Sequence, residues 1–134
     1  MNTKTYAIIT DVHSNSAALN KGLEIINDRD DVDKIIFLGD YFSLGPSPNE
    51  ILDILKSTPN SVVLRGNHER YLIEEIWKDE KPELEGMSQD DPILKEIVDN
   101  EEWTAIQIGQ EGIDFCDAMS ISNREIAGNT LVEF

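Results

Sequence analysis

The feature that most constrains the fold of this sequence is an apolar run, residues 34–38, that ends abruptly in Gly39 and Asp40. This pattern is typical of a buried strand in a parallel sheet, whose carboxyl end faces the ligand site of an α/β fold. Two similar runs also end in polar side chains. Together the three strand ends carry Asp11, His13, Asp40, Asn67 and His68. We therefore expect one site with oxygen and imidazole ligands at one edge of a sheet.

The order of the predicted elements defines the fold class. Apolar runs predict strands at 4–10, 34–38 and 61–64, and apolar residues three to four positions apart predict helices at 16–28, 48–56, 69–78, 92–100 and 103–119. Two short runs, 125–127 and 130–134, flank Gly128 and Asn129 and predict a hairpin with a tight turn. Strands that alternate with helices indicate an α/β fold with right-handed parallel connections. The length indicates a single domain, residues 1–134.

Residues 78–91 interrupt this pattern with an acidic stretch that contains Pro82 and Gly86. Its composition predicts a surface loop within the domain. The sequence leaves two interpretations open: a lid over the strand-end site, or a solvated insertion without a function.

Charge and cysteine content limit the partners and the compartment. The 27 acidic and 11 basic residues give a formal net charge of −16. The negative electrostatic potential of such a chain repels long nucleic acids and anionic membranes. Bound divalent cations would make the potential positive locally and so allow a small phosphorylated substrate. Cys116 is the single cysteine, and the first residues lack the apolar segment of a signal peptide. We therefore expect a cytoplasmic protein without disulfides.

The strand-end residues suit a pair of divalent cations. Asp11 and His13 are two residues apart, so one turn can direct both side chains to the same ion. Asp40 can bridge this ion to a second one, to which the amide oxygen of Asn67 can bind. Two ions about 3.5–4 Å apart hold and activate a hydroxide for attack on a phosphate ester. His68 points elsewhere than Asn67 and is free to protonate the leaving group.

Each of these residues also has an ordinary structural interpretation. An Asp after a strand commonly caps a helix or a turn, and a lone His is commonly a surface or core residue. Asn67 after Gly66 can simply occupy a turn with positive φ. The combination favours a functional site, because both histidines of the chain lie at strand ends beside the acids.

Three ordered motifs carry a resemblance to a known family. They are Asp11-Val12-His13, Gly39-Asp40 and Gly66-Asn67-His68-Glu69, each after a predicted strand. In this order the sequence resembles the calcineurin-like metallophosphoesterases, and within them a small bacterial and archaeal phosphodiesterase-like branch. The likeness is strong over residues 5–70 and weaker beyond.

The resemblance implies a β-sandwich flanked by helices, with two divalent metal ions at the strand ends. It places Asp11 and His13 on the first ion, Asp40 between the two ions, and Asn67 on the second. Mn²⁺ is the first choice of metal, with Fe, Zn²⁺, Ni²⁺ or Mg²⁺ as alternatives. His68 would act as the catalytic acid near the leaving group. The residues expected to contact the substrate are Asn15, Asn67 and His68.

Two departures from the family pattern bear on activity. Where protein phosphatases of the superfamily have an Asp that orients the catalytic histidine and an Arg that binds phosphate, this sequence has Ser43 and Leu44. Phosphoprotein phosphatase activity is therefore not expected. The family also has a further His and a late Gly-His-x-His, and neither is present, since His13 and His68 are the only histidines. We interpret the chain as lacking the C-terminal part of the domain, and we expect the open sheet edge to favour homo-oligomers.

Two classes of function follow. The first is a metal-dependent phosphoesterase that hydrolyses phosphodiesters, phosphomonoesters or nucleotides with a two-metal-activated hydroxide, the 134-residue chain itself being weakly active or inactive. The alternative is a non-catalytic protein-binding module that retains the fold. The missing histidines favour the second class, and the intact strand-end residues favour the first.

Overall fold

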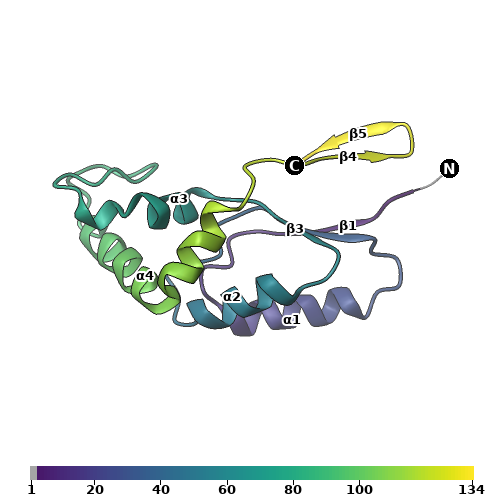
Figure 1. Cartoon of the computed structure of the whole chain (residues 1–134), viewed down its shortest axis with the longest axis horizontal. Coiled ribbons are helices and arrows are strands. Elements are labelled where there is room, and N and C mark those ends of the chain that lie inside the picture. The colour runs from purple at the N-terminus through teal and green to yellow at the C-terminus, as the bar shows by residue number, and fades with distance from the viewer. Residues whose placement is uncertain (1–2) are drawn as a thin grey trace.

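A three-stranded parallel sheet forms the centre of the molecule, as the computed structural model shows for residues 3–134 (Figure 1). Its strands are β1 (Tyr6–Ile9), β2 (Lys34–Phe37) and β3 (Ser61–Val63). β2 lies in the middle and pairs in parallel with both neighbours. The predicted α/β fold with parallel connections is confirmed.

Two helices, α1 (Ser16–Asn27) and α2 (Pro48–Ser57), lie side by side against one face of the sheet (Figure 1). Both helices turn apolar residues toward it because these residues recur three to four positions apart. The core between sheet and helices includes the buried side chains of Leu19, Phe37, Ile51 and Leu55. One detail differs from expectation: Ile25, placed beside the apolar face of α1, is 58% exposed.

Beyond the carboxyl end of β3, the chain forms α3 (Asn67–Glu74) and a short 3₁₀ helix, η1 (Ile76–Lys78). The prediction of one helix over 69–78 has the right end at Lys78, but it has the wrong start and misses an interruption. The α-helix begins two residues earlier, and Glu75 interrupts it with a left-handed backbone, φ 52° and ψ 49°. The interruption redirects the chain so that Ile76 packs in a core cluster with Tyr71 and Leu94.

The longest helix, α4 (Leu94–Asp117), lies against α3 (Figure 1). The prediction of two helices, 92–100 and 103–119, places the break at the wrong position, because the helix continues through the acidic pair at 101–102. Glu101 turns inward and finds hydrogen-bonding partners there. The departure from helical geometry falls instead at Gly109, where φ is 62° and ψ is −171°. Neither α4 nor any other helix of residues 3–134 has the length and apolarity needed to cross a bilayer.

Residues 79–93 connect η1 to α4 without a helix or strand. Most of this acidic segment is exposed, but Leu84 is buried and packs with a second core cluster. The buried members of this cluster are Tyr71, Ile76, Leu84, Leu94 and Val98. A role of residues 78–91 as a lid stays a prediction.

The C-terminal hairpin consists of β4 (Arg124–Ala127) and β5 (Thr130–Glu133), as predicted. Gly128 in its two-residue turn has a φ of 62°, which glycine adopts without strain. The hairpin lies on the side of the sheet opposite α1 and α2 (Figure 1). It contacts the sheet through an ion pair of Glu125 with Lys34 and through the rings of Tyr6 and Phe134, whose centroids are 5.1 Å apart. β4 and β5 thus form a second, two-stranded sheet beside the three-stranded one.

We expect the contact between hairpin and sheet to weaken in acid. Hydrogen bonding to Lys34 lowers the pKa of Glu125 below its ordinary value. A lowered folded-state pKa adds stability that is fully present above the ordinary glutamate pKa and is lost as the pH falls through the folded-state value. The nuclear Overhauser effects between Tyr6 and Phe134 should therefore weaken between pH 6 and pH 3. In the Glu125→Gln variant they should no longer change over that range; an identical loss in the variant would contradict this account.

Candidate metal centre

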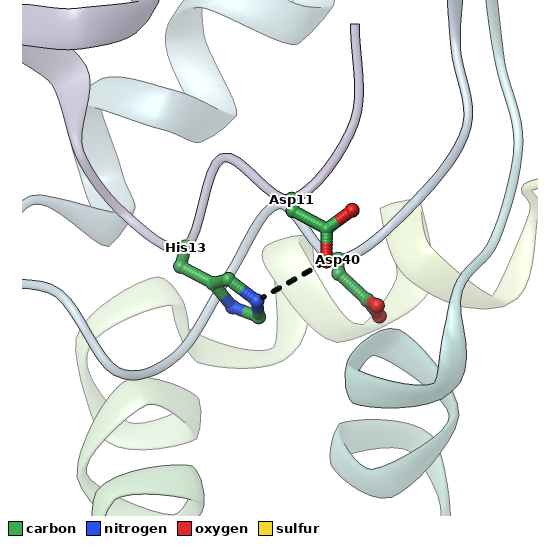
Figure 2. A group of neighbouring side chains, drawn as sticks. All are labelled: Asp11, His13 and Asp40. Carbon is green, nitrogen blue, oxygen red and sulfur yellow. Dashed lines mark ion pairs between the residues drawn. The ribbon is translucent and has the colours of Figure 1, made fainter.

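Three side chains that could hold a cation meet where β1 and β2 end (Figure 2). One ligand atom from each of Asp11, His13 and Asp40 lies within 4.8 Å of the other two. Nε2 of His13 is 3.7 Å from Oδ1 of Asp11. The predicted convergence of the first two strand ends is thus present.

The His13 ring has the orientation that a metal ligand needs. Its Nδ1 is 3.4 Å from the carbonyl oxygen of Phe42, which can only accept a hydrogen bond. A ring that donates from Nδ1 to this carbonyl has Nε2 directed to the cluster, where it is 3.7 Å from Oδ1 of Asp11. Metal-ligating histidines commonly donate the other ring N–H in this way.

Backbone hydrogen bonds join the loops after β1 and β2 into one unit. The amide of Asp11 donates to the carbonyl of Gly39 at 3.2 Å, and the amide of His13 donates to that of Asp40 at 3.0 Å. This pairing continues the register of the two strands beyond their ends. The relative position of the carboxylates is therefore set by main chain rather than by flexible side chains.

The same two loops hold unfavourable backbone conformations. Six residues other than glycine have positive φ there: Asp11, His13, Ser14, Asp40, Ser43 and Leu44. Each such conformation costs about 1–3 kcal/mol and persists only when the surrounding structure enforces it. Strain of this kind concentrates at functional sites, which supports the assignment of this region as the site.

Two glycines allow the ends of β2 and β3 to approach closely. A Cβ atom on Gly39 would lie 2.6 Å from Cα of Gly66, and a Cβ atom on Gly66 would lie 2.4 Å from Oδ1 of Asp40. No side chain fits between the two turns. The glycines before Asp40 and Asn67 are thus required by contact between the strand ends.

We expect Gly66→Ala to displace Asp40. The added methyl group should destabilise the fold by about 1–3 kcal/mol, as overpacking does, and should weaken divalent-cation binding. Urea unfolding and calorimetric titration with Mn²⁺ measure the two effects. Gly22→Ala is the matched control, since nothing lies within 4 Å of its Cβ position in α1; equal behaviour of the two variants would contradict the packing argument.

A buried carboxylate, Glu69, ties the loop after β2 to the loop after β3. It is 0% exposed and accepts four backbone N–H groups: those of Asp40 and Tyr41 at 2.8 Å, Gly66 at 2.9 Å and Phe42 at 3.3 Å. Burial raises the pKa of the Glu69 carboxyl above its ordinary value, and these donors oppose the shift. Its role follows from the contacts: Glu69 fixes the backbone that carries Asp40.

The side chain of Asn67 supplies a test of whether a cation fits. Its amide can take two orientations. In one, the nitrogen donates to both carboxylate oxygens of Asp40, at 3.0 and 3.1 Å, and the oxygen accepts from the Tyr71 hydroxyl. In the other, the nitrogen donates to that hydroxyl at 3.3 Å and the amide oxygen faces the Asp40 carboxylate. In the second orientation the amide oxygen of Asn67 and the carboxylate oxygens of Asp40 are all acceptors, so a cation between them would hold them together. These oxygens therefore fit a metal ion in the second orientation, whereas the first orientation is satisfied without one.

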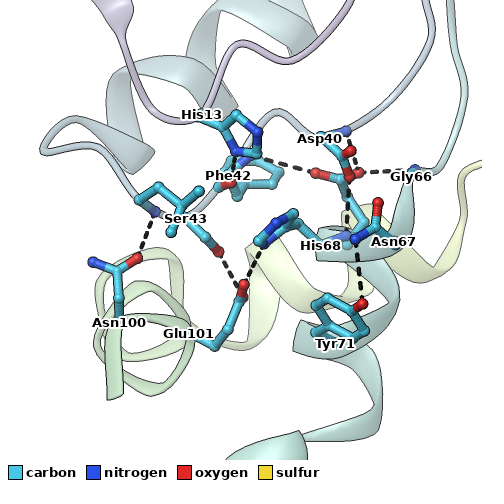
Figure 3. Close-up of polar contacts among 12 residues, drawn as sticks. His13, Asp40, Phe42, Ser43, Gly66, Asn67, His68, Tyr71, Asn100 and Glu101 are labelled. Atoms are coloured by element: carbon cyan, nitrogen blue, oxygen red, sulfur yellow. Dashed lines mark hydrogen bonds and ion pairs between the residues drawn. The ribbon is translucent and has the colours of Figure 1, made fainter. Parts of the chain in front are cut away.

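His68 follows Asn67 at the start of α3 and lies beside the cluster (Figure 3). Its ring centroid is 4.9 Å from that of His13, and its backbone N–H donates to Oδ1 of Asp40 at 3.0 Å. Its Nδ1 contacts the buried carboxylate of Glu101. Burial lowers the pKa of His68, but the hydrogen bond and charge of Glu101, together with the charges of Asp40 and Glu69, outweigh burial and raise the pKa above the ordinary value.

Glu101, which contacts His68, was not among the site residues predicted from the sequence. A pattern in the sequence could have found it: the buried residues Leu94, Val98 and Ile108 define one face of α4, and Glu101 falls on that face. An acid among apolar residues at helical spacing needs an internal partner. The predicted helix break at this point concealed the pattern.

Asn15 has a structural role in addition to the substrate contact expected of it. It is the N-cap of α1, and its Oδ1 accepts the backbone N–H of Ala18 at 3.0 Å. The amide nitrogen of Asn15 is the group that remains to donate to a phosphate. The contact of Asn15 with a substrate stays a prediction.

The fold and the site define an α/β domain with a candidate cation cluster at the ends of its parallel strands. The chain belongs to the calcineurin-like phosphoesterase family, whose sequence profile matches residues 4–129. Two curated relatives align with about half of the chain. An uncharacterised protein of Methanocaldococcus jannaschii is 40% identical over 63 residues, 47% of this chain and 25% of that protein. A symmetrical bis(5'-nucleosyl)-tetraphosphatase of Coxiella burnetii is 36% identical over 66 residues, 49% of this chain and 23% of that enzyme.

Two solved structures share the fold over nearly the whole chain. A hypothetical protein of Pyrococcus horikoshii has a TM-score of 0.74 at 20% identity and covers 96% of this chain. A metallophosphoesterase of Sphaerobacter thermophilus has a TM-score of 0.61 at 26% identity and covers 97%. The chain spans 52% and 46% of these two chains, about half of each. The predicted family and fold are confirmed.

Proposed function

We propose that the chain carries the metal-binding part of a metal-dependent phosphoesterase. The observation that carries this proposal is the meeting of Asp11, His13 and Asp40 at the strand ends, with their ligand atoms within 4.8 Å of one another. Membership of the calcineurin-like phosphoesterase family supports it. The non-catalytic alternative gives no reason for a strained, oxygen-rich cluster in this position.

The roles proposed for the residues follow from their placement. Asp11 and His13 would hold one divalent cation, Asp40 would contact both cations, and the amide oxygen of Asn67 would contact the second. When bound, such cations supply a nucleophile at neutral pH and neutralise phosphate oxygens. His68 would protonate the leaving group, since its ring lies beside His13 and the cluster.

A small phosphorylated molecule is the substrate class that we propose. The relative from Coxiella burnetii is named as a nucleotide tetraphosphatase, which supports a nucleotide as one candidate. The net charge of −16 disfavours long polyanions. We propose Mn²⁺ as the metal, because the family resemblance favours it. The single cysteine supports a cytoplasmic location. We also propose self-association, since an open sheet edge can pair with a second copy of the chain.

We expect hydrolysis of bis(p-nitrophenyl) phosphate by the 134-residue chain to depend on Mn²⁺. Turnover should be slow, should disappear in excess EDTA and should return when Mn²⁺ is restored. Asp11→Asn should lower it at least about 10-fold, because the first cation loses a charged ligand. Asp31→Asn, an exposed acid paired with Arg29, is the control and should leave turnover unchanged. Turnover that resists both EDTA and Asp11→Asn would contradict the proposed function.

A further inference from the structure

Helix α4 brings a buried carboxylate to the edge of the site without placing it among the proposed cation ligands. The side chain of Glu101 is 0% exposed. One of its oxygens contacts Nδ1 of His68, and the other accepts a hydrogen bond from Oγ of Ser43 at 2.6 Å (Figure 3). A buried carboxylate is costly unless it is paired and hydrogen-bonded. Both oxygens of Glu101 meet this condition, with one partner in the loop after β2 and the other in the first turn of α3.

The contact with Glu101 assigns the two nitrogens of the His68 ring. An ionised carboxylate can only accept, so Nδ1 must carry the proton in this hydrogen bond. Within residues 3–134, the ring makes its hydrogen bond to Glu101 alone, through Nδ1. Nε2 is therefore left for a ligand, on a ring that lies edge to face with His13 at a centroid distance of 4.9 Å.

The same helix also fixes the loop that follows β2. Asn100 accepts the backbone N–H of Leu44 at 2.5 Å, next to the bond between Ser43 and Glu101. Ser43 and Leu44 have left-handed φ values of 68° and 64°, which require such support. Residues 100–101 thus hold this loop and the His68 ring in one arrangement.

We propose that Glu101 is a positioning residue that keeps one proton of His68 at Nδ1 and directs Nε2 to the leaving group of the substrate. The proton transferred is a second one, carried by Nε2: its N–H bond breaks as the O–H bond of the leaving group forms, and the ring returns to the Nδ1–H tautomer. The catalytic part of this inference rests on the proposed function, whereas the assignment of the tautomer does not. In other proteins, a carboxylate that accepts the N–H of a metal-binding or catalytic histidine fixes the orientation of the ring and its tautomer. Glu101 would act on His68 in the same way. Glu101 itself touches neither substrate nor cation.

The tautomer can be measured in the unmodified, metal-free chain. Long-range ¹H–¹⁵N spectra of a sample with ¹⁵N-labelled histidine contain two rings, because His13 and His68 are the only histidines. The His68→Asn variant identifies the resonances of His68 by their absence. We expect the ¹⁵N chemical shift of Nδ1 to be that of a protonated ring nitrogen, at pH 7 and at pH 9. An Nε2–H tautomer in the unmodified chain would overturn the proposal.

Three variants separate positioning from a purely structural role. In Glu101→Leu the Nδ1–H tautomer should be lost. Glu101→Gln retains a carbonyl acceptor and should restore it. Glu102→Leu, the exposed neighbour on α4, is the matched control and should leave the spectrum unchanged. Retention of the Nδ1–H tautomer in a folded Glu101→Leu variant would contradict the proposal.

Kinetics then distinguish this inference from the proposed function. In Glu101→Leu we expect kcat to fall at least about 10-fold for an alkyl phosphodiester, a poor leaving group, with KM within about 2-fold. The loss for a p-nitrophenyl ester should be much smaller, because that leaving group needs no protonation. Equal losses for both substrates would overturn the positioning role. An Nδ1–H tautomer in a chain that neither binds Mn²⁺ nor hydrolyses a phosphate ester would overturn the proposed function alone.

Discussion

Replacement of Asp40 by Asn is expected to abolish divalent-cation binding while leaving the fold intact. Asp40 is the residue proposed to contact both cations, so its charge matters to each. We expect the affinity for Mn²⁺ to fall by about 100-fold or more, since metal affinity depends on ligand charge and number. The amide of Asn retains an oxygen that can accept the N–H of His68, so unfolding in urea should change by less than about 1 kcal/mol. Calorimetric titration and urea unfolding of the same samples measure both quantities.

Asp53→Asn is the control for this experiment. Asp53 is an exposed acid on α2, remote from the strand ends, and its replacement removes the same charge. Equal affinities of the two variants for Mn²⁺ would show that the cation responds to the general acidity of the chain. That result would contradict a site centred on Asp40.

Replacement of Glu69 by Ala is expected to have the largest effect on stability. It would leave four N–H groups without their acceptor, those of Asp40, Tyr41, Phe42 and Gly66. Each buried N–H group that loses its partner costs about 1–3 kcal/mol, so we expect a loss of about 3 kcal/mol or more in the free energy of unfolding. Glu69→Gln should also destabilise, because its amide nitrogen would face backbone donors. Urea unfolding followed by circular dichroism measures both variants.

Glu74→Ala provides the comparison on the same helix. Its side chain is 52% exposed and lies 3.6 Å from Arg70, an arrangement in which ion pairs contribute little. We expect a change within about 0.5 kcal/mol. If Glu69→Ala unfolded at the same urea concentration as Glu74→Ala, the proposed role of Glu69 in fixing the loops would be wrong.

The strand ends could be predicted from sequence because their pattern is local. An apolar run that ends in glycine and aspartate, as at residues 34–40, specifies both a buried strand and the position of its polar end. The backbone strain at Asp11, His13 and Asp40 could not be predicted, because it depends on hydrogen bonds between loops distant in sequence.

Two buried acids show where sequence reasoning reached its limit. Glu69 lies inside a recognised motif, but its acceptor role depends on amides 27 to 29 positions away. Glu101 contacts His68 across 33 positions and lies between the two predicted helices, 92–100 and 103–119. Contacts that span such distances follow from the packing of α4 against α3, which local patterns do not specify.

The central claim is that the ends of parallel strands bring Asp11, His13 and Asp40 together around a divalent cation. Anomalous diffraction at the manganese absorption edge, from crystals of the chain grown with Mn²⁺, tests it most directly. We predict a peak within about 2.6 Å of a carboxylate oxygen of both Asp11 and Asp40 and of Nε2 of His13, the range for divalent-cation ligands. Manganese bound only elsewhere, such as at the acidic turn of residues 28–33, with none at the strand ends, would contradict the claim.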